Sequence, residues 1–132
     1  MQKSSLLHYL LPILLTLPLL LAGCNSASSG APQAIESYLE SLAAKDQNQM
    51  IFQSCAEWEA EARLEYDSFA AVEVTLEELE CQESALEGDY TLVSCTGRIV
   101  ASYGAEDLVI ELPERTFKAI QQGGEWRMCG YQ

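Results

Sequence analysis

The cysteines are the residues whose chemistry is easiest to assign from sequence, and there are five of them. A thiol can close a disulfide, bind a metal or carry a covalent group. Cys55, Cys81, Cys95 and Cys129 contain no closely spaced pair, and the one histidine, His8, lies in an apolar N-terminal stretch. Zinc sites need Cys or His pairs at short spacing, so we expect no metal site and no cofactor. The fifth cysteine, Cys24, belongs to the N-terminal motif described below, which predicts export. The other four form an even set, and in an oxidising compartment outside the cytoplasm they predict two disulfides.

Four cysteines allow three pairings, and one local pattern favours a particular one. Cys81 and Cys95 lie symmetrically about Gly88, at the centre of Glu87-Gly88-Asp89. A hairpin turning there would set the two cysteines opposite each other on neighbouring strands. The expected pairs are therefore Cys81–Cys95 and Cys55–Cys129. Closing the 15-residue loop of the first pair is worth about 3 kcal/mol in the loop-entropy model.

Carboxylates form the next group that could do chemistry. Glu57, Glu61 and Glu65 recur every four residues, with Glu59 and Arg63 between them. A cation site would need their oxygens to converge, whereas a helix directs such side chains outward. We therefore expect a solvated helix face, and the same holds for the acidic run Glu77, Glu78 and Glu80.

The remaining large polar-tipped side chains are aromatic. Trp58 and Trp126 could line a ligand pocket, but aromatic residues at periodic positions are more often core. No nucleophile-elbow motif is present, and no histidine follows His8 to activate a nucleophile. The ligand-binding residues stay unassigned by the sequence.

The N-terminal segment predicts export. Lys3 precedes a 16-residue apolar stretch, Leu6–Leu21, which contains two prolines. As a helix it would be about 24 Å long, short of the ~30 Å hydrocarbon core, so a cleaved signal fits better than a permanent span. The motif Leu21-Ala22-Gly23-Cys24 resembles the lipobox of bacterial lipoproteins. That resemblance implies lipid attachment to the Cys24 thiol and cleavage just before it.

Three regions follow from this interpretation: a signal peptide over 1–23, a lipidated N-terminus and flexible tether over 24–32, and one domain over 33–132. Two or more acyl chains anchor a protein stably, so the expected partner is the membrane, on its extracytoplasmic side. The segment after the cleavage site has 20 acidic against six basic residues, a net charge of −14. Such a surface repels nucleic-acid phosphates and anionic lipid headgroups.

The elements that must position these side chains change from helix to strand along the chain. Helical spacing runs over 32–45, Asp46 and Gln49 resemble a capping box before Met50, and a third helix is predicted over 56–66. Alternation then predicts strands, which we list in order: Val72–Leu76, the hairpin over 79–93, Tyr90–Tyr103, Leu108–Ile120 interrupted at Pro113, and Glu125–Tyr131. Helices followed by an antiparallel meander predict an α+β domain.

This order of elements, with the ending Gly123-Gly124-Glu125-Trp126-Arg127, resembles the nuclear transport factor 2-like, cystatin-like superfamily over residues 33–131. The resemblance implies two or three helices packed on a curved, cone-like sheet, with room for a pocket and no single activity. Some superfamily enzymes pair an Asp base with a Tyr donor in the cone. Here Asp67, Tyr38, Tyr66, Tyr90 and Tyr103 are available, although their spacing does not predict convergence.

The functional expectation is a membrane-tethered, non-enzymatic binding or interaction module that takes a small ligand or an envelope protein. One alternative is an isomerase- or hydratase-like enzyme, which requires a buried carboxylate with a raised pKa in an open cone. The other is a purely structural component of the cell envelope.

Overall fold

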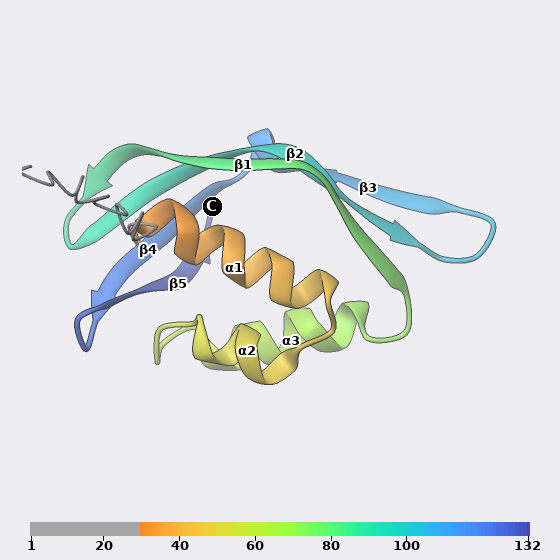
Figure 1. Ribbon diagram of the computed structural model, residues 1–132, viewed down its shortest axis with the longest axis horizontal. Helices are drawn as coiled ribbons and strands as arrows, with labels where there is room; N and C mark the ends of the chain where they lie inside the picture. Colours follow the sequence, from red (N-terminus) through yellow and green to blue (C-terminus); the bar gives the residue numbers. More distant parts are fainter. Residues whose placement is uncertain (1–29) are drawn as a thin grey trace, which may run out of the picture.

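The computed structural model describes residues 30–132, which form three helices followed by an antiparallel sheet (Figure 1). Cys24, its motif, the predicted signal peptide and most of the predicted tether lie outside the described residues. The elements run in the order α1 (Ala31–Ala43), α2 (Gln47–Phe52), α3 (Glu59–Phe69), β1 (Glu73–Glu87), β2 (Tyr90–Ser102), β3 (Asp107–Glu111), a 3₁₀ turn η1 (Leu112–Glu114), β4 (Thr116–Gln122) and β5 (Glu125–Tyr131). The α+β class predicted from the sequence is confirmed.

The helices begin where local chemistry favours them. Pro32 occupies the first turn of α1, where its missing amide hydrogen costs nothing. The Asp46 side chain accepts the Gln49 amide at 3.0 Å and caps α2. The third helix begins at Glu59, later than predicted from its period, because residues 55–58 form a turn in which the Trp58 amide bonds the Cys55 carbonyl. None of the helices described here is both long and apolar enough to cross a membrane.

The sheet is antiparallel and follows the predicted meander. Its strand order is β1-β2-β4-β5, and β3 pairs with β2 next to β4. The interruption expected at Pro113 is η1, which separates β3 from β4 along the same side of β2. The first strand is longer than the alternation indicated, because Glu73–Glu87 continues through an irregularity at Glu78.

That irregularity is a β-bulge that bends the β1–β2 ribbon. Pairing shifts between Glu77 and Glu80, and Glu78 has a left-handed φ of 54°. Gly97 lies opposite with a φ of 86°, and a Cβ there would overlap the backbone oxygens of Glu77 and Glu78. The bent sheet arches over α1, as Figure 1 shows from the side.

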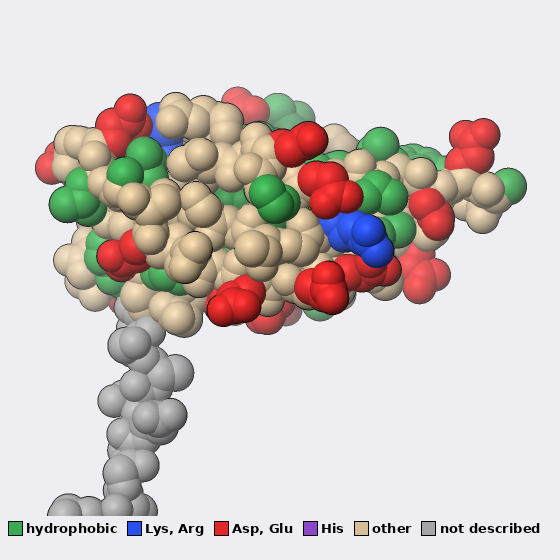
Figure 2. Space-filling model, turned by 90° about the horizontal axis from the view of Figure 1, so that it is seen from above, with side chains coloured by type: hydrophobic (Ala, Val, Ile, Leu, Met, Phe, Trp, Pro, Cys, Tyr) green, Lys and Arg blue, Asp and Glu red, His purple; other side chains and the backbone are tan. Residues whose placement is uncertain are grey.

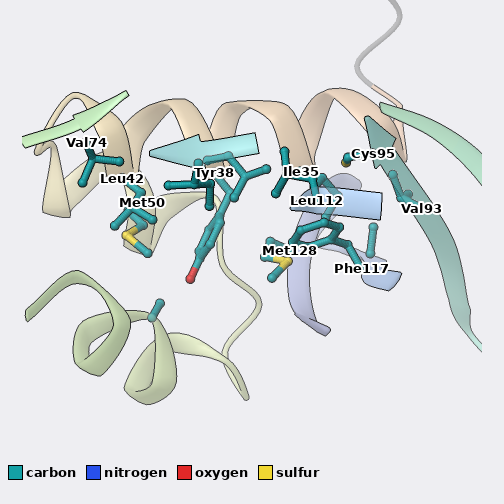
Figure 3. Packing of buried hydrophobic residues seen from close by; sticks show 14 of the residues in the cluster. Ile35, Tyr38, Leu42, Met50, Val74, Val93, Cys95, Leu112, Phe117 and Met128 are labelled. Carbon is teal, nitrogen blue, oxygen red and sulfur yellow. The ribbon is translucent and has the colours of Figure 1, made fainter. Parts of the chain in front are cut away.

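The core lies between α1 and the concave face of the sheet. Ile35, Leu39 and Leu42 come from one face of α1 and meet inward-facing strand residues (Figure 3). The strand and α2 contributors are Met50, Val74, Val93, Ile99, Phe117 and Met128, all buried. Side chains therefore fill the concave side of the sheet along α1.

Both disulfides have the pairing predicted from the hairpin. Cys81 and Cys95 are register partners on β1 and β2, with their Cα atoms 4.1 Å apart. Cys55 and Cys129 join the turn before α3 to β5, with Cα atoms 5.2 Å apart. In the loop-entropy model, the longer loop of the second bridge makes it the more stabilising, at about 4.5 kcal/mol.

Candidate functional site

Five side chains from separate parts of the fold converge beside α3. Tyr38 comes from α1, Trp58 from the turn before α3, Glu65 from α3, Arg115 from the end of η1 and Tyr131 from β5. We call these residues the Glu65 cluster. Tyr38 reaches across from α1 with its hydroxyl directed toward α3 (Figure 3). The cluster thus connects the helical layer to the last strand.

Hydrogen bonds occupy both oxygens of the Glu65 carboxylate. The Tyr38 hydroxyl donates to Oε2 at 2.5 Å, and the Tyr131 hydroxyl donates to Oε1 at 3.4 Å. The indole Nε1 of Trp58 in turn donates to the Tyr38 hydroxyl oxygen at 3.2 Å. No buried side-chain nitrogen or oxygen among residues 30–132 lacks a partner. The cluster is therefore a fully connected polar network.

Arg115 is the cation of the cluster. Its Nη1 lies 4.0 Å from Glu65 Oε1, and its guanidinium stacks 4.5 Å from the centroid of the Tyr131 ring. Trp58 meets the same ring edge-on, with the two centroids 5.7 Å apart. The side chain of Arg115 is 26% exposed and that of Glu65 only 11%. Arg115 is thus the charged member of the cluster that solvent reaches more easily.

Burial is the largest influence on the pKa values of Glu65, Tyr38 and Tyr131. It raises the pKa of Glu65 above its ordinary value, and the Tyr38 hydroxyl, the Arg115 charge and the Tyr131 hydroxyl oppose that rise. Burial, together with the Glu65 carboxylate, raises the pKa of Tyr38 and also that of Tyr131. Both tyrosines therefore remain hydroxyl donors to Glu65 at neutral pH.

A hollow of about 250 Å³ opens beside the cluster on the α3 side. Its wall combines Trp58, Glu65, Arg115 and Tyr131 with residues of α3, which are Glu61, Leu64, Ser68 and Phe69. Leu64 is 61% exposed despite its apolar side chain. The hollow therefore offers an apolar surface, a guanidinium, a carboxylate and a hydroxyl within one small space.

A second hollow, of about 190 Å³, lies where α1 begins. Phe52, Trp126 and Arg127 line it together with residues of the first turns of α1. The Arg127 guanidinium stacks 4.2 Å from the centroid of the Phe52 ring and also bonds the Phe52 carbonyl and the Glu125 carboxylate. Its cation is thus already engaged, which makes this hollow the weaker ligand site.

The prediction for the glutamates is wrong in one respect. Glu57 and Glu61 are exposed, as expected, and Glu57 precedes the first residue of α3. Glu65 is instead the centre of the cluster, with only 11% of its side chain exposed. It follows the buried Ala62 by three residues and precedes the buried Phe69 by four, which places it on the inner face of α3. That apolar spacing was readable in the sequence.

The other sequence candidates do not converge. Asp67 is exposed, Tyr103 is 52% exposed, and the Tyr66 hydroxyl donates to the Lys45 carbonyl at 3.1 Å. Tyr90 lies on β2, with the Lys118 ammonium 5.7 Å from its ring centroid. Of these candidate tyrosines, Tyr38 is the one whose hydroxyl meets a carboxylate, that of Glu65. In the acidic run of β1, Glu78 and Glu80 are exposed and Glu77 is half-buried. Over residues 30–132, no set of three or more acidic, Cys or His side chains is arranged to hold a metal.

Comparison with known proteins shows a likeness of fold. No protein-family model and no curated protein sequence matches the chain. A SEC-C motif-containing protein from Rhodopseudomonas palustris is 12% identical with a TM-score of 0.51, over 75% of this chain and 74% of that one. The helical cell shape determining protein Pgp2 from Campylobacter jejuni is 9% identical (TM-score 0.49), over 75% of this chain and 38% of Pgp2. Aln2 from a Streptomyces species is 13% identical (TM-score 0.47), over 75% of this chain and 82% of Aln2.

Proposed function

We propose that this protein is a lipid-anchored, extracytoplasmic binding module with a non-enzymatic domain of the nuclear transport factor 2-like class. The motif Leu21-Ala22-Gly23-Cys24 after an apolar leader supports the anchor. The order of helices followed by a curved antiparallel sheet supports the assignment of the domain.

The observation that carries the binding role is the hollow beside the Glu65 cluster. Trp58 and the exposed Leu64 offer it an apolar surface, and Arg115 adds a partly exposed guanidinium. Binding sites characteristically combine an apolar wall with a few placed polar groups. A small ligand with a flat apolar part and one hydrogen-bond acceptor would match this wall.

The same geometry disfavours proton transfer. A catalytic base and a hydroxyl donor must both face the substrate. Here the Tyr38 hydroxyl donates to the carboxylate itself, and Tyr38 is fully buried beneath it. The network thus fixes the wall of the hollow and engages both oxygens of Glu65, so this carboxylate is not a free base.

The binding role is tested by isolating the full-length protein from its native membranes and identifying retained small molecules by native mass spectrometry and extraction. We expect one retained compound, lost in Leu64→Glu and in Arg115→Gln. Arg63→Gln, on the same helix but outside the hollow, is the matched control and should retain it. Wild-type protein that carries nothing would contradict the proposal and favour a purely structural envelope role.

One observation favours a second candidate, an isomerase- or hydratase-like enzyme. Glu65 is a buried carboxylate at the edge of a hollow, and burial raises its pKa. Such an enzyme would exchange protons beside a carbonyl, which NMR detects as deuterium incorporation from D₂O into a panel of ketones and thioesters. We expect none above the uncatalysed rate. Incorporation that Glu65→Gln abolishes would replace the non-enzymatic proposal with this one.

A further inference from the structure

The strand β3 forms one edge of the sheet. Each of the other two edges is bonded at one or more atoms by a group from outside the sheet. On β1, the Cys81 amide donates to the Glu36 carboxylate of α1 at 2.8 Å. On β5, Met128 exchanges backbone hydrogen bonds of 2.7 Å with Gln53 and Cys55. Within residues 30–132, β3 pairs only with β2.

The register shows which backbone groups β3 leaves free. The Tyr103 amide bonds the Glu106 carbonyl at 2.8 Å, and this pair continues the β2–β3 ladder. Hydrogen-bonded pairs alternate along an antiparallel ladder, so Leu108 and Ile110 are the residues that bond β2. Asp107, Val109 and Glu111 therefore direct their amide hydrogens and carbonyl oxygens away from the sheet.

The side chains of this edge are apolar and acidic. Leu108 is 48% exposed and Val109 46%. Around them lie six acidic residues of β1, β3 and the turn before β3, which are Glu73, Glu77, Glu78, Glu106, Asp107 and Glu111. Arg98 is the one cation in this three-stranded stretch, and Glu77 binds it with an Nε–Oε2 distance of 2.6 Å. Figure 2 shows the acidic and apolar side chains together at the narrow end of the molecule.

This end lies far from the start of α1. Figure 1 shows β3 and its hairpin at one end of the long axis and the first turn of α1 at the other. If the chain is anchored through Cys24, the β3 edge is presented away from the membrane. An exposed edge of this kind is a template for a further strand.

We propose that the β3 edge binds an extended, lysine- or arginine-bearing polypeptide segment of another protein as an added strand. Basic side chains of that segment would lie opposite Asp107 and Glu111 on one face, and its alternating apolar side chains would lie beside Leu108 on the other face. A second copy of this chain does not fit, because its own edge is acidic and like charges directly opposite are destabilising. The acids that deter self-pairing are the ones that would select a basic strand.

The probe for this proposal is a blocked synthetic peptide of alternating lysine and valine, titrated into the isotope-labelled protein and followed by the protein's amide NMR signals. We expect the shifts to centre on β3 and binding to weaken at high salt. Val109→Pro removes an outward amide and should weaken binding about fivefold or more, whereas Val109→Thr should not. Asp107→Asn with Glu111→Gln should also weaken it, while Glu57→Gln with Glu59→Gln, just before and at the first residue of α3, should not.

Two further peptides keep the test independent of how the variants fold. The lysine–valine peptide methylated at every backbone nitrogen keeps its charge but cannot donate hydrogen bonds, and we expect it not to bind. The alternating glutamate–valine peptide should not bind either. Equal binding of the methylated peptide, or shifts spread over all acidic faces, would show charge attraction alone and overturn the proposal. So would no binding, shifts centred on the α3 hollow, or concentration-dependent dimerisation through β3.

Discussion

Glu65 shows how position changes the role of a residue type. It has the same side chain as its exposed neighbours Glu59 and Glu61, yet it is largely buried and accepts hydrogen bonds from Tyr38 and Tyr131. A buried carboxylate without partners would be costly, so these donors are what make the position tolerable. Glu65, and not Glu59 or Glu61, accepts these hydrogen bonds because it lies on the inner face of α3.

The pH dependence of stability provides a test of this placement. The pKa of Glu65 is raised in the folded protein from an ordinary value of 4.5. The folded state thus keeps a proton that the unfolded chain releases, so this contribution to stability is complete below 4.5 and is lost as pH rises through the folded pKa. Glu65→Gln cannot ionise. We therefore expect the free energy of unfolding of Glu65→Gln, minus that of the wild type, to increase with rising pH.

Urea unfolding followed by tryptophan fluorescence, from about pH 4 to about pH 8, measures that difference. Glu61→Gln, one turn earlier on α3, is the control for losing one carboxylate from the helix. A difference for Glu65→Gln that is independent of pH, or that falls as pH rises, would contradict the placement of Glu65 in the network.

At the scale of elements, β1 departs from regular pairing at the bulge around Glu78 and again between Glu83 and Ala85. The irregular stretch Glu77–Glu80 requires a partner residue without a side chain, and Gly97 fills that position on β2. The alternating pattern of the sequence predicted the strands but not the bulge. A glycine within a strand does suggest a bulge or a close backbone approach, and Gly97 was the available signal.

Gly97→Ala tests whether the close approach is structural. Gly97 and Gly104 both have a φ of 86°, but a Cβ at Gly104 would meet nothing within 4 Å. Both alanine variants therefore carry the left-handed strain of about 1–2 kcal/mol. Only Gly97→Ala also forces the strands apart, adding about 1–3 kcal/mol. Thermal and urea unfolding of the two variants should show this excess, and equal losses would mean that the bulge relaxes freely.

At the scale of the whole molecule, the domain is acidic and has its two candidate contact surfaces in different places. The hollow lies beside α3, and the free edge of β3 lies at the end of the molecule far from the start of α1 (Figure 1). A net charge of −14 over residues 24–132 disfavours adsorption to anionic lipid headgroups. Membrane attachment would then depend on the proposed lipid at Cys24 alone.

Cys24→Ser tests the anchor. Without the thiol no diacylglyceryl group can be attached, and each buried CH₂ contributes about 0.8 kcal/mol to membrane binding. We expect the variant to be absent from washed membranes of the native host, whereas wild type remains there. Cys55→Ser with Cys129→Ser is the control for cysteine loss and should stay bound. A Cys24→Ser protein that sediments with membranes would refute lipid anchoring.

The sequence by itself determined the features that depend on local pattern. These are the change from helical to alternating period, the break at Pro113 and the turn at Gly88. The symmetry of Cys81 and Cys95 about Gly88 also predicted the cysteine pairing. Only the tertiary structure decided which side chains meet Glu65, how the strands approach each other at Gly97 and which backbone groups of β3 stay unpaired. These depend on residues far apart in the chain, such as Tyr38, Glu65 and Tyr131, meeting across layers. Spacing along one element does not specify contacts between elements, because they are set by how the packed surfaces fit.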